Sequence, residues 1–434
     1  MKLKKSSNFK NEYPMHSAIS VSSEIGPLRR VIVHRPDEGI AQVSPARAAE
    51  LLFEDIVLLP QMQNEHDIFT GILKAFLGDN NVLEVQTLIE EALKAETKHQ
   101  EKLIDSIIQM ERLPNTYDDL LKKLPPPKLA EVLITGYYEE KDIILFDPIP
   151  NFIFTRDIAV TVNDHIIITK AAKKARFRES MLTAFIFWAH PLFKQLYENG
   201  KVIDVNDVDL FPPSNRGEAV TIEGGDVMII NKDYLLIGCS ERTSAHTIHS
   251  LKKVLFEKGV VKNVVQINIP QDRSCMHIDT IFTQISEKHV AAYRPLVIDG
   301  KSTFIEVHRH DGSKTTYPTT RDFFKSEINP EIEFILCGEG KSPHQEREQW
   351  TSGCNLVSIR PSVALTYDRN PYTEKAFEEA GYHVVTAKDL LNALQAGIVK
   401  AEEVENTIIT LPSTELSRAR GGSHCMTCPI ERGA

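Results

Sequence analysis

The feature that most constrains the fold is a pattern that recurs four times after Lys141. In each copy a polar residue leads into an apolar strand, a short polar turn and a second apolar strand, and the copies start at Asp157, Asp226, Asp279 and Asn355. Helical patterns ended by glycine follow several copies, as in AHTIHSLKKVLFEKG and YTEKAFEEAG. Units of this kind arranged around an axis bring equivalent strand ends to the centre, so we expect a site built from distant parts of the chain.

The part of the chain before these repeats predicts one strand followed by helices. The segment LRRVIVHRPDEG, which follows Pro27, has the pattern of a buried strand closed by a turn, and residues 44–77 have the pattern of helices. Gln86 to Glu111 is a long charged helical pattern, and further helix surrounds a proline break after it. We interpret residues 86–140 as a helical insertion, although the same pattern also allows helices that pack on the main sheet as ordinary layers.

Composition narrows the function classes. The length of 434 residues leaves the domain count open. With 42% hydrophobic and 25% charged residues, and no apolar run near the roughly 18 residues that a bilayer span needs, we expect no membrane partner. The net charge of -10 is spread along the chain, which argues against a nucleic-acid partner and mildly favours a small cationic substrate.

Cysteine usage and the start of the chain predict a cytoplasmic location. Six cysteines are too sparse for a disulfide framework in a chain of this length, so a reducing compartment is the simpler home. Met1 to Lys10 is basic and polar with no apolar stretch behind it, which argues against a secretory signal.

A reactive thiol is the first candidate for chemistry. Cys425 lies in LSRARGGSHCMTCPIERGA, after two glycines that allow close backbone approach and two arginines that favour a thiolate. The alternative is an inert tail in which the pair Cys425 and Cys428 does nothing. A redox or zinc site is the weaker interpretation, because the sequence has no second pair with ligand spacing.

Several residues that carry or accept protons accompany this thiol. His277 and Asp279 lie two apart in CMHIDT, on one face of an extended segment, and can transfer protons and orient substrate. Glu223 in IEGGDV and Asp157 in FTRD precede predicted strands. Each acidic residue alone is more often a strand cap or a solvated turn, and together with His277 they would also suit a metal. The thiol favours a different use of the same groups.

Carboxylates gathered around a thiol suit a planar cation. Asp and Glu accept paired hydrogen bonds from guanidinium nitrogens. Their negative charge would raise the pKa of the thiol in the free site, and a bound guanidinium would offset that effect by placing a positive charge beside the sulfur. Activation of Cys425 would then depend on the bound substrate.

Taken together, these segments resemble the arginine deiminases of the guanidine-modifying enzyme superfamily, which also holds amidinotransferases and dimethylarginine hydrolases. The resemblance runs in order along nearly the whole chain, through SEIGPLRRVIVHRP, LLFEDI, NFIFTRD, ARFRES, EGGDV, MHIDTIFTQ, REQWTSGCN, YDRN and SRARGGSHCM. It implies a five-bladed pseudosymmetric α/β propeller of ββαβ-type units, with the active site at its axis, and a single catalytic domain over residues 1–434 that carries the helical insertion at 86–140.

The resemblance also implies the roles of particular residues. Cys425 would be the nucleophile and His277 the general acid and base, while Asp157 and Asp279 would hold the guanidinium and Glu223 would assist binding and proton transfer. The further residues that match the substrate pocket are Asn151, Phe154, Arg176, Arg242 and Arg420, of which Arg176 and Arg242 would grip the substrate carboxylate.

The implied reaction is hydrolysis of L-arginine to L-citrulline and ammonia. The thiolate attacks the guanidinium carbon, ammonia leaves with a proton from His277, and water activated by His277 hydrolyses the covalent amidino-thioether. No metal and no organic cofactor is implied, and the partners are the substrate and water. Many such folds assemble into oligomers, so we expect at least a homodimer.

Three departures qualify the resemblance. Residues 388–412 are longer than expected between YDRN and the final motif, and include a charged helical pattern that would serve as a lid, an oligomer contact or decoration. His424 lies where many deiminases carry arginine, which would alter thiol activation or gating. Cys428 is close enough in sequence to Cys425 for an oxidative disulfide, although an inert thiol is the simpler expectation.

Other activities stay open at this point. An amidinotransferase would form the same covalent intermediate and pass it to an amine. A citrulline or methylarginine hydrolase would keep Cys425 and His277 with a different guanidinium pocket, and a catalytically silent scaffold would need neither a nucleophile nor a proton carrier.

Overall fold

The computed structural model describes residues 19–53 and 55–433. Met1 to Lys10, which we expect to hold no secretory signal, lies outside the described residues. None of the helices in the described part of the chain combines the length and the apolar character that a membrane crossing requires.

Five sheets of the described chain share one unit of three strands. In the order in which the strands of each unit are named below, the first and second strands form an antiparallel pair. The second and third strands pair in parallel. The units are β5 (Ala159–Val162), β6 (His165–Ile168), β7 (Val202–Asp204); β8 (Val227–Asn231), β9 (Tyr234–Cys239), β10 (Asn263–Asn268); β11 (Phe282–Gln284), β12 (His289–Ala292), β15 (Glu333–Leu336); β16 (Val357–Arg360), β17 (Val363–Tyr367), β19 (Thr407–Leu411); and β20 (Cys428–Arg432), β1 (Leu28–Val33), β2 (Val82–Glu84).

The four hairpins predicted from the recurring pattern are confirmed as antiparallel pairs. Turn chemistry explains two of them, because Asn163 and Ser362 adopt positive φ angles of 50° and 65° between their strands. β5, β17 and β19 are buried along their whole length, which matches sequences that contain only apolar residues and threonine apart from the Tyr367 at the end of β17. The expected mixed α/β class is therefore confirmed, whereas the described sheets do not close on themselves and the five-bladed propeller stays a prediction.

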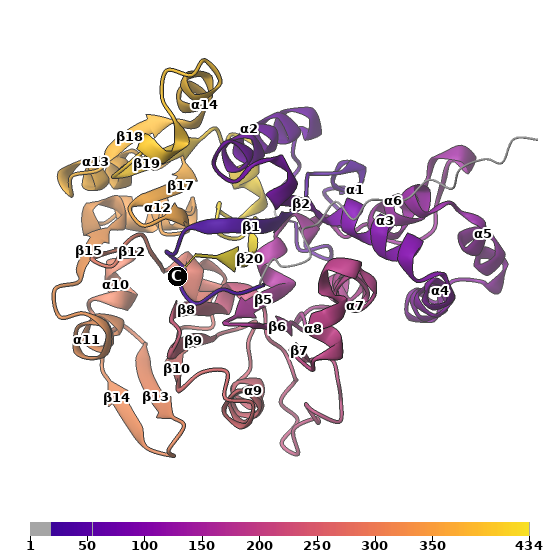
Figure 1. Ribbon diagram of the computed structural model, residues 1–434, viewed down its shortest axis with the longest axis horizontal. Coiled ribbons are helices and arrows are strands. Elements are labelled where there is room, and N and C mark those ends of the chain that lie inside the picture. Colours follow the sequence, from indigo (N-terminus) through magenta and orange to yellow (C-terminus); the bar gives the residue numbers. More distant parts are fainter. Residues whose placement is uncertain (1–18, 54, 434) are drawn as a thin grey trace, which may run out of the picture.

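Helices connect the second and third strands of the units and cover the sheets (Figure 1). α9 starts at a Ser244 hydroxyl that accepts from the Thr247 amide, and both α9 and α13 end before glycines with positive φ angles, Gly259 and Gly381. The connecting helices are α1 (Glu38–Ala41), α2 (Leu59–Leu77), α7 (Phe177–Ala189), α8 (Pro191–Glu198), α9 (Ala245–Glu257), α10 (Arg294–Val297), α11 (Thr320–Phe323), α13 (Pro371–Glu379) and α14 (Ala387–Gln395), with α12 (His344–Trp350) between two units. The remaining strands are β13 (Phe304–Arg309), β14 (Lys314–Tyr317) and β18 (His383–Thr386), which extend two of the sheets.

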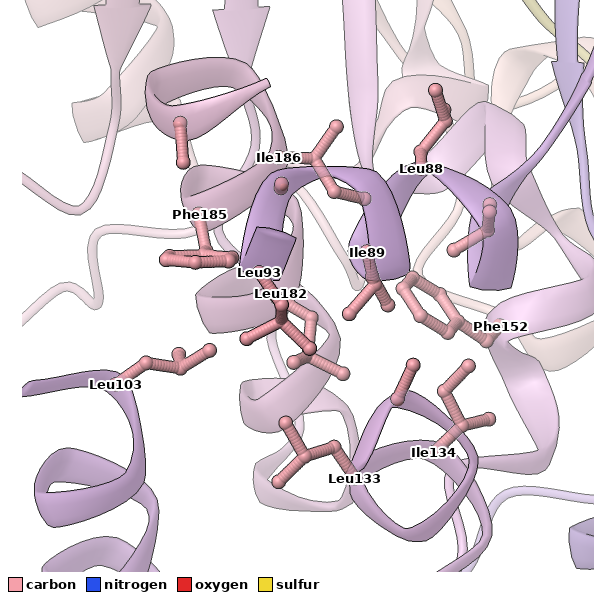
Figure 2. Packing of buried hydrophobic residues seen from close by; sticks show 14 of the residues in the cluster. Leu88, Ile89, Leu93, Leu103, Leu133, Ile134, Phe152, Leu182, Phe185 and Ile186 are labelled. Carbon is pink, nitrogen blue, oxygen red and sulfur yellow. The ribbon is translucent and has the colours of Figure 1, made fainter. Parts of the chain in front are cut away.

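Residues 86–140 are mainly helical, as predicted, and lie at one side of the sheets (Figure 1). The expected long helix is broken near Glu96, and a second break precedes the prolines that begin at Pro125. The elements are α3 (Val85–Ala95), α4 (Thr97–Glu111), α5 (Asp118–Lys123), α6 (Pro126–Thr135) and the small hairpin of β3 (Tyr137–Tyr138) and β4 (Ile143–Ile144). Figure 2 shows that the apolar faces of α3, α6 and α7 pack together, in a cluster that also includes residues of β5, β6 and β20, so this segment shares a core with the sheets.

Two predictions about local structure are corrected by the structure. Only the second part of residues 44–77 is a regular helix, because residues 45–52 form a series of turns before α2 begins at Leu59. Residues 388–412 are not a surface addition: they hold most of α14, which packs on α2, and β19, which lies between β17 and β18 in a sheet. β19 is buried throughout and belongs to the core, whereas residues 391–403 before it are half-buried or exposed.

Candidate active site

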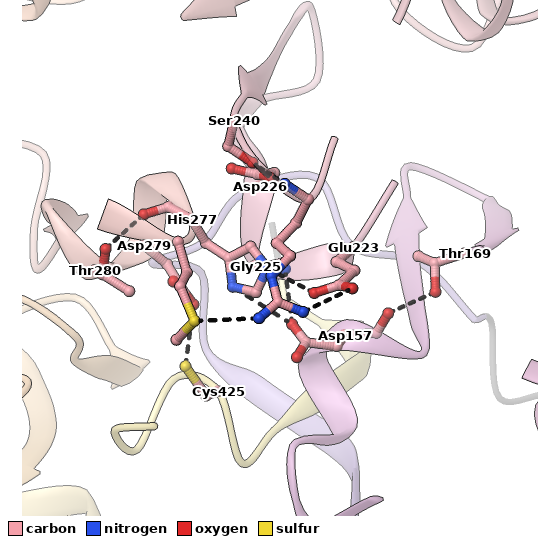
Figure 3. Close-up of polar contacts among 12 residues, drawn as sticks. Asp157, Thr169, Glu223, Gly225, Asp226, Ser240, His277, Asp279, Thr280 and Cys425 are labelled. Carbon is pink, nitrogen blue, oxygen red and sulfur yellow. Dashed lines mark hydrogen bonds and ion pairs between the residues drawn. The ribbon is translucent and has the colours of Figure 1, made fainter. Parts of the chain in front are cut away.

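Nine of the ten predicted site residues line one cavity of about 220 Å³. Four of them lie in the short turns that lead into the first strand of a unit: Asp157 before β5, Glu223 before β8, His277 before β11 and Cys425 before β20. Figure 3 shows these side chains facing one another from separate segments. The predicted residues that line the cavity are Asn151, Phe154, Asp157, Arg176, Glu223, Arg242, His277, Arg420 and Cys425.

His277 lies between two carboxylates. Its Nε2 is 2.9 Å from Glu223 Oε2 and its Nδ1 is 3.8 Å from Asp157 Oδ1. Burial alone would lower the pKa of this imidazole, but the surrounding carboxylates of Asp157, Glu223 and Asp226 outweigh it and raise the pKa to about 10. His277 is therefore a cation near neutral pH and has a proton to give to a leaving group.

Glycine at position 225 is required by the histidine. A Cβ atom there would lie 2.5 Å from the His277 Nδ1 atom, and the Gly225 amide donates to Asp157 Oδ1 at 3.2 Å. The EGGDV motif thus lets the backbone approach the imidazole closely while fixing one carboxylate beside it.

Cys425 is held by two neighbours behind it. Its Sγ is 3.4 Å from Asp279 Oδ2, and its backbone amide donates to Asn355 Oδ1 at 3.2 Å. Burial, together with the charges of Asp279 and Asp157, raises the pKa of the Cys425 thiol well above its ordinary value. The thiol is therefore protonated in the free site, as predicted from the gathered carboxylates.

The two glycines before Cys425 permit this packing. A Cβ atom at Gly422 would lie 2.4 Å from Asn355 Oδ1, and one at Gly421 would lie 2.2 Å from the Phe154 ring. Phe154 therefore forms a cavity wall directly against the cysteine loop, as expected for a residue of the substrate pocket.

Asp279 differs from the other predicted residues, because it is fully buried and is not part of the cavity lining. Its Oδ2 atom accepts from both Cys425 Sγ and, at 2.9 Å, His424 Nδ1. Its Oδ1 atom has no hydrogen-bond partner among the described residues. Asp279 thus lies behind the sulfur, with one carboxylate oxygen still able to accept a donor.

His424 bridges two carboxylates from distant parts of the chain. One ring nitrogen faces Asp279, and the other, Nε2, lies 3.3 Å from Oε2 of the buried Glu24. Glu24 in turn pairs with Arg156. The two ring nitrogens of His424 thus face carboxylate oxygens from two distant segments of the chain.

The arginines occupy the other side of the cavity. Arg176 Nη1 lies 2.6 Å from Asp157 Oδ2 and 3.7 Å from Glu223 Oε2, while its Nε donates to Glu179 at 2.9 Å. Arg242 Nη1 lies 3.7 Å from Glu223 Oε1. Arg176 therefore contacts Asp157, which was predicted to hold the guanidinium, and both arginines contact Glu223, which was predicted to assist binding and proton transfer.

Two further pocket residues have identifiable partners. The Asn151 side-chain amide donates to the Leu51 carbonyl at 2.7 Å, and its own carbonyl accepts from Arg176 Nη2 at 3.3 Å. Arg420 has its guanidinium carbon 3.2 Å from the centroid of the Trp350 ring. Asn151 thus joins the turn over residues 45–52, which contributes Ala49 and Leu52 to the lining, to the arginine side of the cavity.

A metal ion would meet an unsuitable set of ligands in this cavity. Asp157, Glu223 and His277 have ligand atoms within 4.8 Å of one another, which is a possible metal spacing. The imidazole, however, has a raised pKa and holds its proton, and Arg176 already neutralises Asp157 at 2.6 Å. The arrangement fits a guanidinium better than a metal ion.

Cys428 faces away from the nucleophile. It lies in β20 with its Sγ 3.2 Å from the Ala159 carbonyl oxygen, and both it and Cys425 are free thiols. Burial raises the pKa of Cys428 to about 12, so the expectation of an inert thiol fits its surroundings.

Sequence reasoning missed Asn355 and Glu24. Asn355 Oδ1 accepts from the amides of His424 and Cys425, and its Nδ2 donates to the Asp279 carbonyl at 3.1 Å. Both residues lie in quoted motifs, REQWTSGCN and SEIGPL, but nothing in the residue types alone indicates which distant partner each one meets. Their role becomes visible only from contacts with the cysteine loop.

Comparison with known proteins identifies the family. A model described as arginine deiminase matches residues 49–141 and 120–432. The chain is 30% identical to the arginine deiminase of Borrelia garinii subsp. bavariensis, with 95% of this chain and 98% of the relative covered, and 31% identical to that of Listeria monocytogenes serotype 4b, with 96% and 98% covered. An amidinotransferase of Microseira wollei from a saxitoxin biosynthetic pathway is 13% identical, with a TM-score of 0.51 and coverage of 96% and 98%, and so shares the fold. The family prediction from the sequence motifs is confirmed: this chain belongs to the arginine deiminase family.

Proposed function

We propose that the cavity is the active site at which this enzyme hydrolyses L-arginine to L-citrulline and ammonia. Membership of the arginine deiminase family makes the chain a hydrolase of the guanidino C–N bond. The observation that carries the assignment of the site is the single cavity shared by the Cys425 thiol and the ion-paired His277, with carboxylates and arginines around them. A nucleophile, a proton carrier and charges of both signs are the parts that this reaction needs.

Substrate binding would use charges of both signs. The guanidinium of arginine pairs with Asp157 and Glu223 in the cavity, and the negative charge of Asp279, buried behind the sulfur, attracts the same cation without lining the cavity. The arriving guanidinium replaces Arg176 at Asp157, so that Arg176, together with Arg242, meets the substrate carboxylate. Asn151, Phe154 and Arg420 complete the walls of the pocket.

Activation of the thiol follows from this binding. The bound cation offsets the negative charge of Asp157 and Asp279 that raises the pKa of Cys425, and the thiol loses its proton to solvent when substrate is in place. The thiolate attacks the guanidinium carbon and forms a tetrahedral adduct. His277, cationic near neutral pH, gives its proton to the departing nitrogen, and ammonia leaves.

The second half-reaction regenerates the enzyme. The neutral His277 left by the first step removes a proton from water, which attacks the carbon of the amidino-thioether. Collapse of the second adduct breaks the C–S bond and releases citrulline, and the proton of the adduct hydroxyl passes to the sulfur and restores the thiol. Glu223, hydrogen-bonded to His277 Nε2 at 2.9 Å, keeps the imidazole oriented through both steps.

We also infer the wider organisation from these features. The five three-stranded units are the blades of a pseudosymmetric propeller of one catalytic domain, with residues 86–140 as an insertion, because the five units share one strand arrangement and four of them place a catalytic side chain in the turn before their first strand. We infer a cytoplasmic homo-oligomer from the cysteine usage and the fold. Gel filtration that gives the mass of a monomer at working concentration would overturn the oligomer.

The test of the function is incubation of purified protein with L-arginine and no acceptor amine, following citrulline and ammonia together. Equal release of both products, lost in Cys425→Ala and kept in the matched control Cys239→Ala, is the expected result. Amidino transfer that appears only when an amine is added would assign an amidinotransferase instead. Turnover of citrulline or methylarginines alone would assign one of the related hydrolases, and binding of arginine with no product would indicate a silent scaffold.

A further inference from the structure

Asn355 lies in the turn before β16, the first strand of the unit that also contains β17 and β19. The other four units each place a catalytic side chain in the turn before their first strand. Residues 355–411, all of which the structure describes, add nothing to the lining of the cavity. Asn355 is instead buried behind the cysteine loop. This unit therefore contributes to the site from outside the cavity.

The side chain of Asn355 joins two loops of the site. Its Oδ1 atom accepts from the His424 amide at 3.1 Å and from the Cys425 amide at 3.2 Å. Its Nδ2 atom donates to the Asp279 carbonyl at 3.1 Å. One planar amide thus connects the backbone that carries the nucleophile with the backbone that carries the carboxylate behind it.

The cysteine loop packs closely on this amide. A Cβ atom at Gly422 would lie 2.4 Å from Asn355 Oδ1, so only glycine allows the approach. The Ser423 hydroxyl donates to the Leu365 carbonyl at 2.6 Å and accepts from the Val357 amide at 3.3 Å. The loop is therefore attached to β16 and β17 on the side that faces away from the cavity.

Thr283 fixes the backbone on both sides of Asn355. Its hydroxyl donates to the Cys354 carbonyl at 2.7 Å and accepts from the Leu356 amide at 3.2 Å. Thr283 lies in β11, the strand that follows Asp279. The backbone that carries the Asn355 amide is thus hydrogen-bonded to the same segment that carries Asp279.

We propose that Asn355 is a positioning residue that holds the Cys425 loop against the Asp279 segment, so that the sulfur stays beside this carboxylate and faces the cavity. Asn355 touches neither substrate nor reacting atoms and acts through the backbones of Cys425 and Asp279. An amide suits this role because it accepts and donates at once and adds no charge beside the thiol. The inference rests on the proposed function, in which Cys425 is the nucleophile.

The first experiment measures steady-state citrulline release from L-arginine by Asn355→Ala. We expect kcat to fall by about 10²-fold, because a displacement of roughly 1 Å takes the sulfur out of line with the guanidinium carbon. KM should stay within about 3-fold, since other residues contact the substrate. An unchanged kcat would overturn the inference, whereas a parent enzyme that releases no citrulline would instead overturn the proposed function.

The matched control is Asn263→Ala. Asn263 is also a buried asparagine that accepts and donates through its side chain, from Arg309 and to the Asp233 carbonyl, but it lies in β10 outside the cavity lining. It should leave kcat unaltered. An equal loss of kcat in both variants would show that removing a buried amide disturbs the enzyme in general, and would overturn the specific role of Asn355.

A second readout does not depend on turnover. Cys425 Sγ lies 3.4 Å from Asp279 Oδ2, so a loop released by Asn355→Ala should carry the sulfur away from this negative charge. The pH profile of Cys425 alkylation by iodoacetamide, followed by mass spectrometry of its peptide, should then move to lower pH. In an Asp279→Asn background the same change should move the profile much less. An equal shift in both backgrounds would overturn the inference.

Asn355→Asp carries the test if Asn355→Ala fails to fold. The side chain keeps its shape and an oxygen for the two amides, but an oxygen replaces the donor that meets the Asp279 carbonyl. Loss of that hydrogen bond should lower kcat by about 5-fold or more with KM nearly unchanged. A kcat equal to that of the parent would show that the link to Asp279 is dispensable, and would overturn the inference.

Discussion

The helical segment and the active site are both buried, yet their interiors are made of opposite kinds of side chain. The cluster between α3, α6 and α7 contains aliphatic and aromatic residues such as Ile89, Ile134 and Phe185 (Figure 2). The active site buries Glu223 and His277 as an ion pair (Figure 3), and Arg176 pairs with the same glutamate. Apolar packing depends on volume and tolerates changes of geometry, whereas buried charges need each partner in place. Substitutions should therefore affect stability in the first region and chemistry in the second.

The largest expected effect lies in the active site. His277→Asn should lower kcat for arginine by about 10³-fold, because the proton carrier for both half-reactions is lost. The comparison between the two regions predicts that KM changes much less, since binding rests on the carboxylates and arginines. Stopped-assay kinetics of citrulline release measure both constants.

The matched control is His249→Asn, which changes an exposed histidine on α9 and should leave kcat unaltered. A His277→Asn enzyme that kept more than about a tenth of the parent kcat would show that another group carries the proton.

The next effect belongs to the helical segment. Ile134→Ala, at a side chain that is 1% exposed, should lower the free energy of unfolding by about 3 kcal/mol, through lost burial and the cavity left behind, with kcat/KM unchanged below the melting transition. Denaturant unfolding followed by circular dichroism measures the change. Ile144→Ala makes the same substitution nearby at a side chain that is 65% exposed and should cost little. A large loss of kcat/KM in Ile134→Ala would show that the two regions are not independent.

The smallest effect sharpens the electrostatic side of the comparison. Asp279 and Asp157 add to burial in raising the pKa of the Cys425 thiol, so loss of the negative charge in Asp279→Asn should lower that pKa. The alkylation rate of the free enzyme by iodoacetamide, measured from about pH 6 to 10, should then rise at a lower pH. Alkylation near neutral pH should therefore be faster in this variant than in the parent, because the thiolate is the reactive form.

Turnover of arginine by the same variant should fall, so the two readouts move in opposite directions. Asp272→Asn replaces an exposed aspartate near the histidine loop and should alter neither of them. An alkylation profile that stays in place, or moves to higher pH, would remove Asp279 from the causes of the raised pKa.

Local patterns predicted much of this architecture. The four hairpins, the helices ended by glycine and the helical character of residues 86–140 follow from period and turn residues, which act over a few positions. β19 was missed as a core strand because its apolar run follows a charged helix and resembles a surface addition until β17 and β18 are placed on either side of it.

The residues of the active site could also be predicted in part from the sequence. Residue types and family motifs indicated Cys425 and His277, and the cavity brings them together. The contacts of Asn355 with the cysteine loop and of Glu24 with His424 could not be predicted, because hydrogen bonds between distant segments depend on the register of several sheets at once. The turns over residues 45–52 were also missed, since apolar side chains that line a cavity carry the same pattern as a helix face.

The pairing of β20 with β1 has a consequence for how the enzyme acquires activity. Glu24 and His424, which meet beside these strands, lie 400 residues apart in the sequence. Contacts between residues so far apart in the sequence form late in folding, because closing a long loop costs conformational entropy before the contact stabilises the chain. The reactive thiol lies just before β20 and would reach its place in one of these late steps. A partly folded chain would therefore hold a collapsed interior while still lacking a competent nucleophile, which makes regain of turnover a stricter probe of refolding than recovery of secondary structure.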